Sequence, residues 1–307
     1  MASLQGRDLL SLADFSSEEI AELLNLAIQL KSKEIEPLRR KVLGLLFYKA
    51  STRTRVSFLV AMYQLGGQAI DLNTSVTQIS RGEPLEDTAK VLDGYLDILA
   101  IRTYKQTDLE TFAACSQIPI INALSDLEHP CQVLADLLTA QECFGSLTGL
   151  TLTYLGDGNN MANSLLLGCA LMGMNVRIGC PKEYQPDGAI VEQAKQIAAG
   201  KTEVLVTEDP IEAVAGSQIL YTDVWASMGQ EDLAESRIPI FQPYQLNQAL
   251  LEKADKDAIA LHCLPAHREE EITDEVIAGS QSRIWQQAAN RMHAQKALLL
   301  SLLGGSY

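Results

Sequence analysis

The 307-residue sequence predicts an α/β fold made of two doubly wound, parallel-sheet (Rossmann-like) domains with a cleft between them. Two observations lead to this prediction. Short apolar runs alternate with amphipathic stretches along the whole chain, which is typical of parallel strands joined by crossover helices. The chain is also about as long as two ordinary domains of roughly 150 residues each.

The short apolar runs are the predicted strands. In the first half of the chain they cover residues 43–48, 68–72, 97–101 and 118–122, and in the second half residues 150–155, 175–180, 202–206, 218–222 and 258–262. Helical periodicity fills the intervals, as in Val56, Leu59, Val60 and Tyr63, which follow the i, i+3, i+4, i+7 spacing. Further helices are predicted over residues 131–144 and 285–303.

The glycines at 145 and 149 mark the break between the predicted domains, because they follow a helix and precede the first strand of the second half. We expect a first domain over residues 1–145 and a second over residues 146–284. Residues 285–307 form a C-terminal helix that returns to pack on the first domain. In such folds ligands bind beyond the carboxyl ends of the strands, so the chemistry is expected directly after the apolar runs.

Composition narrows the class of protein. With 24 basic against 39 acidic side chains and a net charge of −15, the chain is not expected to bind nucleic acid or anionic membranes. No apolar run approaches the roughly 20 residues of a membrane span, and no secretory signal is expected. The six cysteines are scattered and form no CxxC pair, which favours reduced thiols and a cytoplasmic location.

The stretch STRTR, residues 51–55, follows the first predicted strand and begins a helix. A helix N-terminus attracts anions, Ser51, Thr52 and Thr54 add hydroxyl donors, and Arg53 matches phosphate oxygens bidentately. The alternative is an ordinary hydroxyl cap beside solvated arginines. Capping needs only one hydroxyl, and the helix dipole disfavours basic residues in a first turn, so phosphate binding is the preferred interpretation. Arg55 is expected to be structural.

Two more strand exits in the first half carry polar side chains. Arg102 directly follows the predicted strand 97–101 and is a second candidate for the same anion. His129 and Gln132 begin the helix after strand 118–122, where the histidine can donate to a carbonyl oxygen and the glutamine can hold an amide. A lone histidine before a proline is more often a turn residue, and only its position beside the other two groups favours a role in binding.

The second half carries a G-x-G at Gly156 and Gly158, which suggests a dinucleotide site. The third glycine position holds Met161, and no acidic residue ends the next strand, so a nicotinamide-dependent oxidoreductase is disfavoured. Asn160 and Asn159, at the start of the following helix, can hold a carboxylate instead. Asp223, at the exit of strand 218–222, suits an ammonium group.

A histidine-rich stretch follows the last predicted strand. His262, Cys263 and His267 suggest zinc, but no fourth ligand follows at the usual spacing. The sequence therefore predicts no metal site.

Motifs in four places, taken together and in this order, resemble the aspartate/ornithine carbamoyltransferase family. They are STRTR (51–55), HPCQ (129–132), DVWASMGQ (223–230) and HCLP (262–265). The resemblance extends over essentially the whole chain. STRTR and HPCQ are typical of the family, and the SMG and HCLP segments of its ornithine branch.

This resemblance implies an enzyme that transfers the carbamoyl group of carbamoyl phosphate to the δ-amine of L-ornithine, giving L-citrulline and phosphate, as in arginine biosynthesis. It implies no cofactor, because alignment of the reactants and donors to the developing oxyanion suffice. It also implies a homotrimer, or a multiple of trimers, with shared active sites.

The resemblance also assigns roles to the matching residues. Carbamoyl phosphate would be bound by Ser51, Thr52, Arg53, Thr54, Gln78 (entering a neighbouring subunit's site), Arg102, His129, Gln132, Cys263, Leu264 and Arg291. Ornithine would be bound by Asn160, Asp223, Ser227 and Met228. The catalytic residues among these would be Arg102, His129, Gln132 and Cys263.

Two alternative functions stay open. A relative could carbamoylate another amine, such as putrescine or N-acetylornithine, but Asp223 and the SMG segment suit the α-amino acid end that putrescine lacks. A non-catalytic binding protein could keep the same fold, although every motif position holds a competent residue.

Overall fold

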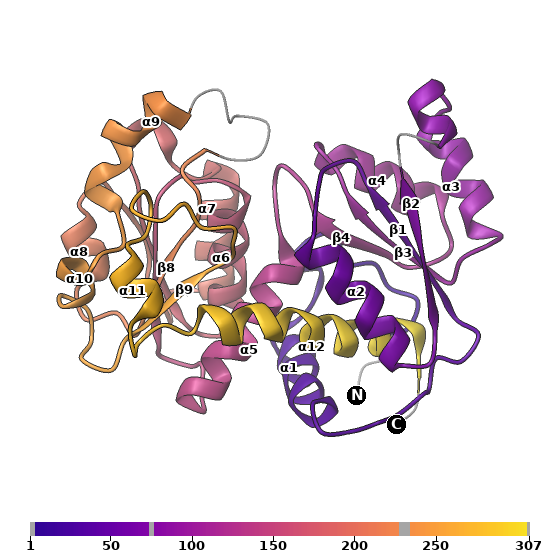
Figure 1. Cartoon of the computed structure of the whole chain (residues 1–307), viewed down its shortest axis with the longest axis horizontal. Coiled ribbons are helices and arrows are strands. Elements are labelled where there is room, and N and C mark those ends of the chain that lie inside the picture. Colours follow the sequence, from indigo (N-terminus) through magenta and orange to yellow (C-terminus); the bar gives the residue numbers. More distant parts are fainter. Residues whose placement is uncertain (1–3, 74–76, 227–233, 306–307) are drawn as a thin grey trace. The chain divides into compact units, whose positions relative to one another are not determined.

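The computed structural model describes residues 4–73, 77–226 and 234–305 (Figure 1). The chain forms two compact units: unit 1 comprises Met1–Leu138 and Asn290–Tyr307, and unit 2 comprises Thr139–Ala289. Each unit is built on a parallel sheet with interleaved helices, so the fold class predicted from the sequence is confirmed. The domain limits at residues 145 and 284, and the cleft, stay predictions.

The sheet of unit 1 has the strand order β2-β1-β3-β4. Its strands are β1 (Val42–Phe47), β2 (Gln68–Asn73), β3 (Ile98–Arg102) and β4 (Ile120–Leu124), all paired in parallel. The chain moves from β1 to β2 on one side and then returns to add β3 and β4 on the other. Because crossover connections are right-handed, this reversal places α2 on one face of the sheet and α3 and α4 on the other. The reversal point lies between β1 and β3, where such folds bind ligands.

The described helices of unit 1 follow the predicted pattern. They are η1 (Leu12–Asp14), α1 (Ser17–Leu30), α2 (Arg53–Gln64), η3 (Gln78–Arg81), α3 (Leu85–Asp93), α4 (Gln106–Cys115), the first part of α5 (Pro130–Phe144) and the last part of α12 (Ile284–Leu303). Lys296 of α12 donates to Gln64 Oε1 of α2 (3.3 Å) and to the Leu30 carbonyl of α1 (3.4 Å). The C-terminal helix therefore packs against the first two long helices of unit 1 (Figure 1).

One face of this sheet carries a closed apolar core. Leu46, Leu99 and Ile101 from the strands pack with Leu109 and Phe112 of α4, and all are buried. Burying a side chain of this size stabilises the fold by about 1.5–3 kcal/mol. The sheet and the helices that present the site are thus held by ordinary hydrophobic packing.

The sheet of unit 2 has the order β7-β6-β5-β8-β9. Its strands are β5 (Thr151–Leu155), β6 (Asn175–Gly179), β7 (Val204–Thr207), β8 (Ile219–Thr222) and β9 (Ile259–His262), again all parallel. The chain reverses between β5 and β8, so the switch point of this unit lies at the carboxyl ends of those two strands.

Helices cover both faces of the unit 2 sheet, as the right-handed crossovers require. Those described are α6 (Asn160–Leu171), η4 (Lys182–Tyr184), α7 (Gly188–Ala198), α8 (Pro210–Val214), α9 (Ala234–Phe241), η6 (Gln242–Tyr244), α10 (Gln248–Leu251) and α11 (Asp274–Ala278). Leu155, Leu220 and Ala260 of the sheet pack with Val276 and Ile277 of α11. Within the described ranges, no helix has the length and apolarity needed to cross a membrane.

The predicted strand ends differ from the observed ones by one or two residues, and β4 shows why. The apolar run begins at Ile118, but the strand begins at Ile120. The backbone N–H groups of Gln117 (2.8 Å) and Ile118 (3.1 Å) donate to the Asp93 carboxylate instead of to a neighbouring strand. The Asp93 side chain, at the end of α3, therefore determines where β4 begins, and the apolar run alone does not show this.

Candidate functional site

The helix N-terminus predicted to bind phosphate lies at the switch point of unit 1. Strand β1 ends at Phe47, and helix α2 begins six residues later at Arg53, after the loop that holds Ser51. Thr52 is the N-cap of this helix. Thr52 makes no side-chain capping hydrogen bond, so the ordinary cap interpretation does not account for this hydroxyl. Arg53 and Thr52 are exposed, whereas Thr54 is buried. This first turn offers backbone N–H groups, hydroxyls and a guanidinium to an anion.

Arg55 has the structural role expected for it. Its guanidinium donates to Asp71 Oδ2 of the neighbouring strand β2 (2.7 Å) and lies over the Phe47 ring (5.4 Å to the centroid). It is therefore tied to the sheet.

Arg102 is the last residue of β3, so the prediction that it follows the strand was one residue off. It is paired in register with Phe47 at the end of β1, and its carbonyl accepts from Tyr48 N–H (2.8 Å). The side chain is buried. Because β1 and β3 are neighbours, the exit of β3 and the loop after β1 lie at the same edge of the sheet.

A buried polar network joins α12, α2 and α5 within unit 1. Arg291 of α12 donates to Thr54 Oγ1 (2.5 Å) and to Gln132 Oε1. Gln132 in turn donates from Nε2 to Asp136 Oδ1 (2.8 Å) one turn further along α5. All these side chains are buried. The structure thus brings together Thr54, Gln132 and Arg291, which lie far apart in the sequence.

His129 immediately precedes α5 and is also buried. Burial lowers its pKa well below the usual 6.5, and the positive charges of Arg291 and Arg102 lower the pKa further. The imidazole is therefore neutral at neutral pH and carries one N–H donor. A neutral donor beside two arginines suits a carbonyl oxygen that becomes negative during a reaction.

Gln78 lies in η3, and its side chain is exposed. The resemblance predicts that it serves a neighbouring subunit, and an exposed position is compatible with that role.

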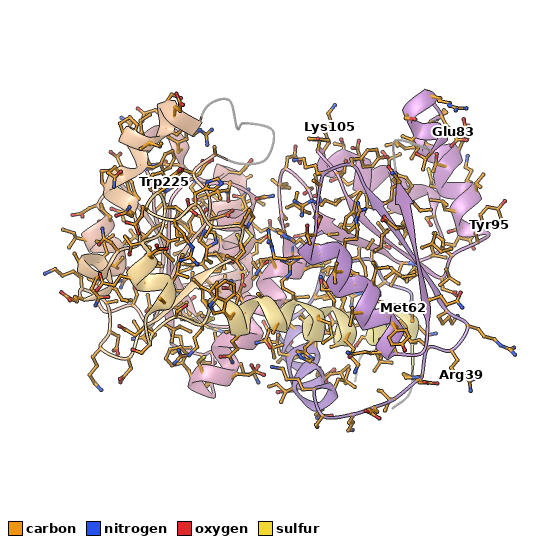
Figure 2. The ribbon with its side chains drawn as sticks, in the orientation of Figure 1. Arg39, Met62, Glu83, Tyr95, Lys105 and Trp225 are labelled. Atoms are coloured by element: carbon orange, nitrogen blue, oxygen red, sulfur yellow. The ribbon has the colours of Figure 1, made fainter. Side chains whose placement is uncertain are left out.

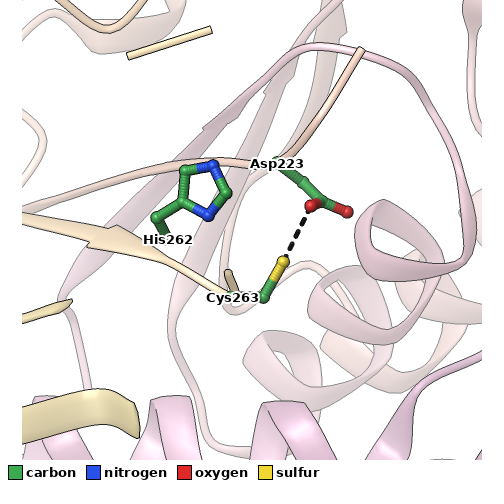
Figure 3. A group of neighbouring side chains, drawn as sticks. All are labelled: Asp223, His262 and Cys263. Atoms are coloured by element: carbon green, nitrogen blue, oxygen red, sulfur yellow. Dashed lines mark hydrogen bonds between the residues drawn. The ribbon is translucent and has the colours of Figure 1, made fainter. Parts of the chain in front are cut away.

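Two site residues predicted in unit 2, Asp223 and Cys263, come together at the carboxyl ends of neighbouring strands of its sheet. Asp223 directly follows β8 and is buried, and Cys263 directly follows β9. Cys263 Sγ donates to Asp223 Oδ1 (2.8 Å), as Figure 3 shows. The Val224 N–H donates to the same oxygen (2.8 Å), so the carboxylate is held in one orientation.

The β5–α6 turn supplies the other side of this group. Asn160 is the first residue of α6 and is half-buried. Its neighbour Asn159 is the N-cap, whose Oδ1 accepts from Met161 N–H (2.9 Å), while its Nδ2 donates to Asp223 Oδ2 (3.4 Å). The sequence named both asparagines as able to hold a carboxylate and assigned ornithine binding to Asn160, and the structure shows that Asn159 orients Asp223.

Leu264 follows Cys263 in a left-handed conformation, with φ of 59°. Its N–H donates to His262 Nδ1 (2.8 Å). Two further predicted ligands, Ser227 and Met228, lie outside the described residues.

The sequence analysis did not identify two buried side chains that hydrogen-bond to residues in or near the site, Asp136 and Arg237. Asp136 was detectable, because it lies four residues after Gln132 on one helix face. Arg237 of α9 was not detectable from spacing. It donates to Asp157 Oδ2 (2.8 Å) and to the Trp225 carbonyl (2.6 Å), and so ties the β5–α6 turn to the segment after β8 (Trp225 is labelled in Figure 2).

Ligand atoms that could hold a metal occur in two groups among the described residues. Asp223, His262 and Cys263 place theirs within 4.8 Å of one another. Both ring nitrogens of His262 are already used, because Nδ1 accepts from Leu264 N–H and Nε2 lies 2.9 Å from Glu271 Oε1. A metal needs an unshared nitrogen lone pair, so this set does not fit one. The second group is His267, Glu270 and Glu271, where Glu271 Oε1 already takes two hydrogen bonds.

Two doubly wound units, one with buried arginines beside a helix N-terminus and the other with a buried carboxylate bonded to a thiol, indicate an enzyme of two α/β domains that acts on small polar substrates. Family comparisons identify the class further. Residues 7–142 match the carbamoyl-P binding domain of aspartate/ornithine carbamoyltransferase, and residues 148–302 match its Asp/Orn binding domain.

Individual proteins agree with the family match. An ornithine carbamoyltransferase of Nostoc punctiforme is 71% identical over 99% of both chains. Among solved structures, ornithine carbamoyltransferase from Gloeobacter violaceus has 55% identity and a TM-score of 0.89 over 98% of this chain and 100% of its own. The Pyrococcus furiosus enzyme has 46% identity and a TM-score of 0.96 over the full length of both chains. This chain belongs to the aspartate/ornithine carbamoyltransferase family, which confirms the resemblance drawn from its motifs.

Proposed function

We propose that this chain transfers the carbamoyl group of carbamoyl phosphate to the δ-amine of L-ornithine, producing L-citrulline and phosphate. The observation that carries the proposal is the buried set of Arg102, Arg291, His129 and Gln132 at the switch point of unit 1. Two arginines beside a neutral histidine match a ligand with a dianionic phosphate at one end and a neutral carbamoyl carbonyl at the other.

Most of the proposed ligands of the donor substrate lie in unit 1. The first turn of α2, from Ser51 to Thr54, and Arg102 hold the phosphate. Neutral His129 donates to the carbamoyl carbonyl oxygen, and Gln132, with its orientation set by Asp136 and Arg291, accepts from the carbamoyl amide. Backbone carbonyls of Cys263 and Leu264 provide further acceptors for that amide. These roles follow from matching each donor with the acceptor of the ligand.

The acceptor substrate is bound by unit 2. Asn160, Ser227 and Met228 bind the α-carboxylate and α-amine of ornithine together with Asp223, whose carboxylate suits the ammonium group. Cys263 lies beside Asp223 (2.8 Å) and contacts the δ-amine end. The family match and the high identity to ornithine carbamoyltransferases support this choice over putrescine or N-acetylornithine.

The reaction is a displacement at the carbamoyl carbon. The lone pair of the neutral δ-amine attacks that carbon, and the carbonyl electron pair moves to the oxygen, where His129 and Arg102 stabilise the charge. The electron pair on that oxygen then returns to re-form the C=O bond, while the C–O bond to phosphate breaks and its electron pair leaves with the phosphate. The proton lost by the amine passes to the departing phosphate. Placing donors where the oxyanion develops is the main source of acceleration, and removing one such donor typically costs on the order of 100- to 1,000-fold in rate.

Assembly into trimers is part of the proposal. Val56, Val60 and Tyr63 of α2 are 50%, 37% and 79% exposed, and Ile70 on the edge strand β2 is 48% exposed. Apolar side chains at i, i+4 and i+7 on one helix face favour burial against another subunit. Gln78 then reaches the site of a neighbouring subunit. A cytoplasmic location is proposed from the six cysteines, all of which are free thiols.

The test is product formation from carbamoyl phosphate with ornithine, putrescine and N-acetylornithine in parallel, with citrulline and phosphate quantified. Strong preference for ornithine is the expected outcome. Preference for putrescine would overturn the acceptor assignment and leave the donor half intact. No carbamoylated product with any amine would overturn the enzyme assignment and favour a binding protein.

A further inference from the structure

The loop that carries Cys263 is closed by a single buried carboxylate. Glu271 Oε1 lies 2.9 Å from His262 Nε2 at one end of the loop and accepts from His267 N–H (2.6 Å) at the other. The side chains of His262 and Glu271 are fully buried. One oxygen therefore joins residues on both sides of the Cys263–Ala266 segment.

The hydrogen bonds determine the tautomer of His262. A backbone N–H can only donate, so Leu264 N–H (2.8 Å) makes Nδ1 the acceptor of the ring. The proton of a neutral imidazole is then on Nε2, which donates to Glu271 Oε1. Hydrogen-bond donation therefore runs in one direction, from the Leu264 N–H through the imidazole ring to the Glu271 carboxylate.

The base of the loop is also held. His262 N–H donates to Gln287 Oε1 (2.9 Å), and Gln287 Nε2 donates to Tyr221 OH (3.1 Å) on the adjacent strand β8. Beyond that base, Leu264 adopts a left-handed conformation that branched and bulky residues rarely occupy. Such a conformation persists only where the surrounding structure holds it. Here the Leu264 N–H is held by its hydrogen bond to His262 Nδ1.

We propose that Glu271 is a positioning residue for the amine-acceptor half of the site. Through His262 it holds the Cys263–Leu264 backbone, and thereby places the Cys263 thiol against Asp223. Glu271 itself does not touch substrate. The inference rests on the proposed function for its kinetic consequences, whereas the geometry of the loop is independent of it.

The experiment compares Glu271→Ala, Glu271→Gln and the control Glu275→Gln, an exposed carboxylate on α11. Steady-state kinetics give kcat and KM for each substrate. In parallel, alkylation of Cys263 by iodoacetamide is followed by peptide mapping, with half-buried Cys115 and Cys143 as internal controls. A displaced loop exposes the Cys263 thiol and separates it from Asp223, so its alkylation reports position without any turnover.

Glu271→Ala is expected to lower kcat/KM for ornithine about 30- to 100-fold, the effect of losing a buried charged hydrogen-bond partner. The KM for carbamoyl phosphate should rise less than the KM for ornithine, because the proposed phosphate ligands lie in unit 1 and only the carbamoyl amide meets the Cys263–Leu264 backbone. Cys263 alkylation should accelerate while Cys115 and Cys143 do not change. Glu271→Gln retains an oxygen acceptor and should recover most of the activity, and Glu275→Gln should match the wild type.

A Glu271→Ala protein with wild-type ornithine kinetics and wild-type Cys263 alkylation would overturn the proposal. So would a uniform loss of active enzyme with the KM of both substrates unchanged, because that is the result of general destabilisation. If Glu271→Ala does not fold, His262→Asn takes its place, since it keeps an oxygen towards Leu264 N–H and loses the ring nitrogen facing Glu271. Unchanged alkylation in that variant would overturn the proposal as well. A wild type without carbamoyl transfer would refute the proposed function, and the alkylation comparison would still test the loop.

Discussion

The side chains in the unit 1 site set one another's chemistry. Arg291 holds Gln132, and together with Arg102 it makes protonation of His129 unfavourable. Had the histidine stood near carboxylates, it would carry a positive charge at neutral pH and could not act as a neutral donor. The protonation state of His129 is therefore a consequence of its neighbours as much as of its own type.

The lowered pKa of His129 makes stability depend on pH. The unfolded chain binds a proton at this residue near pH 6.5, whereas the folded chain does so only at much lower pH. The stabilising contribution is therefore fully present above about pH 7.5 and is lost as the pH falls through 6.5 towards the folded pKa. Between pH 7.5 and 5.5 the free energy of unfolding should fall by about 1.4 kcal/mol on account of this group.

Urea unfolding of the wild type and of His129→Gln at both pH values measures this contribution. The variant should lose less stability on acidification, by about 1.4 kcal/mol. His267→Gln is the matched control, because that side chain is 53% exposed. Equal acid destabilisation of the wild type and His129→Gln would contradict the prediction.

Asp136 should support catalysis without touching substrate. It accepts from Gln132 Nε2 (2.8 Å), and this bond points the oxygen of the amide towards Arg291. In Asp136→Ala the amide can rotate, and we expect kcat/KM for carbamoyl phosphate to fall about 10- to 100-fold, the effect of a buried charged hydrogen bond. Steady-state kinetics measure it, with exposed Asp87→Ala as the control. Unchanged kinetics in Asp136→Ala would show that Gln132 needs no such support.

At the scale of elements, the β5–α6 turn shows how backbone packing places a site. Gly158 N–H donates to the Tyr184 carbonyl (2.8 Å), and an added Cβ would lie 2.3 Å from Pro186 N and 2.5 Å from the Tyr184 oxygen. Only glycine allows the turn to approach that segment so closely. The sequence motif at this position thus has a packing reason that is independent of any dinucleotide.

Gly158→Ala should displace the turn that carries Asn160. Because the clash is with backbone atoms, we expect a loss of about 2–4 kcal/mol in stability and about a tenfold rise in the KM for ornithine. Gly188→Ala is the control, since its Cβ would meet nothing within 4 Å at the start of α7. That variant should be neutral or slightly more stable, by up to about 1 kcal/mol. Thermal unfolding and kinetics of both variants check the pair, and equal behaviour would contradict the packing argument.

At the scale of the whole molecule, the distribution of charge and apolar surface determines which ligands and protein partners the chain can bind. The net charge is −15, yet buried arginines lie at the predicted anion site of unit 1. A small anion responds to the local site, whereas a polyanion responds to the long-range field. Tyr95 and Arg39 project outward from unit 1, as Figure 2 shows.

The exposed apolar face of α2 leads to a prediction about assembly. Tyr63→Asp introduces a charge at a position that is 79% exposed in the single chain. If this face is buried between subunits, the variant should dissociate and lose activity, because Gln78 would no longer reach a neighbouring site. Light scattering after size-exclusion chromatography compares it with the wild type, and Glu22→Gln on α1 serves as an exposed control. A monomeric and fully active wild type would refute the trimer.

Much of the fold followed from local patterns. The strands were predicted within one or two residues. Most of them, such as β1, β3 and β5, are buried and read as continuous apolar runs, as is usual in a parallel sheet. The motif residues Ser51, Arg102, His129 and Asp223 were placed at strand exits for the same reason. The exact ends depended on other elements, as Asp93 shows at β4. The roles given to the site residues stay predictions.

The sequence by itself determined the fold class, the family and the residue types at each strand exit. It could do so because apolar periodicity and motif spacing are properties of neighbouring residues. Only the tertiary structure decided that His129 is neutral, that Arg291 meets Thr54 across the chain, and that Glu271 closes the Cys263 loop. These properties depend on burial and on distances of a few ångströms between residues far apart in sequence, and the order of residues does not encode such distances directly.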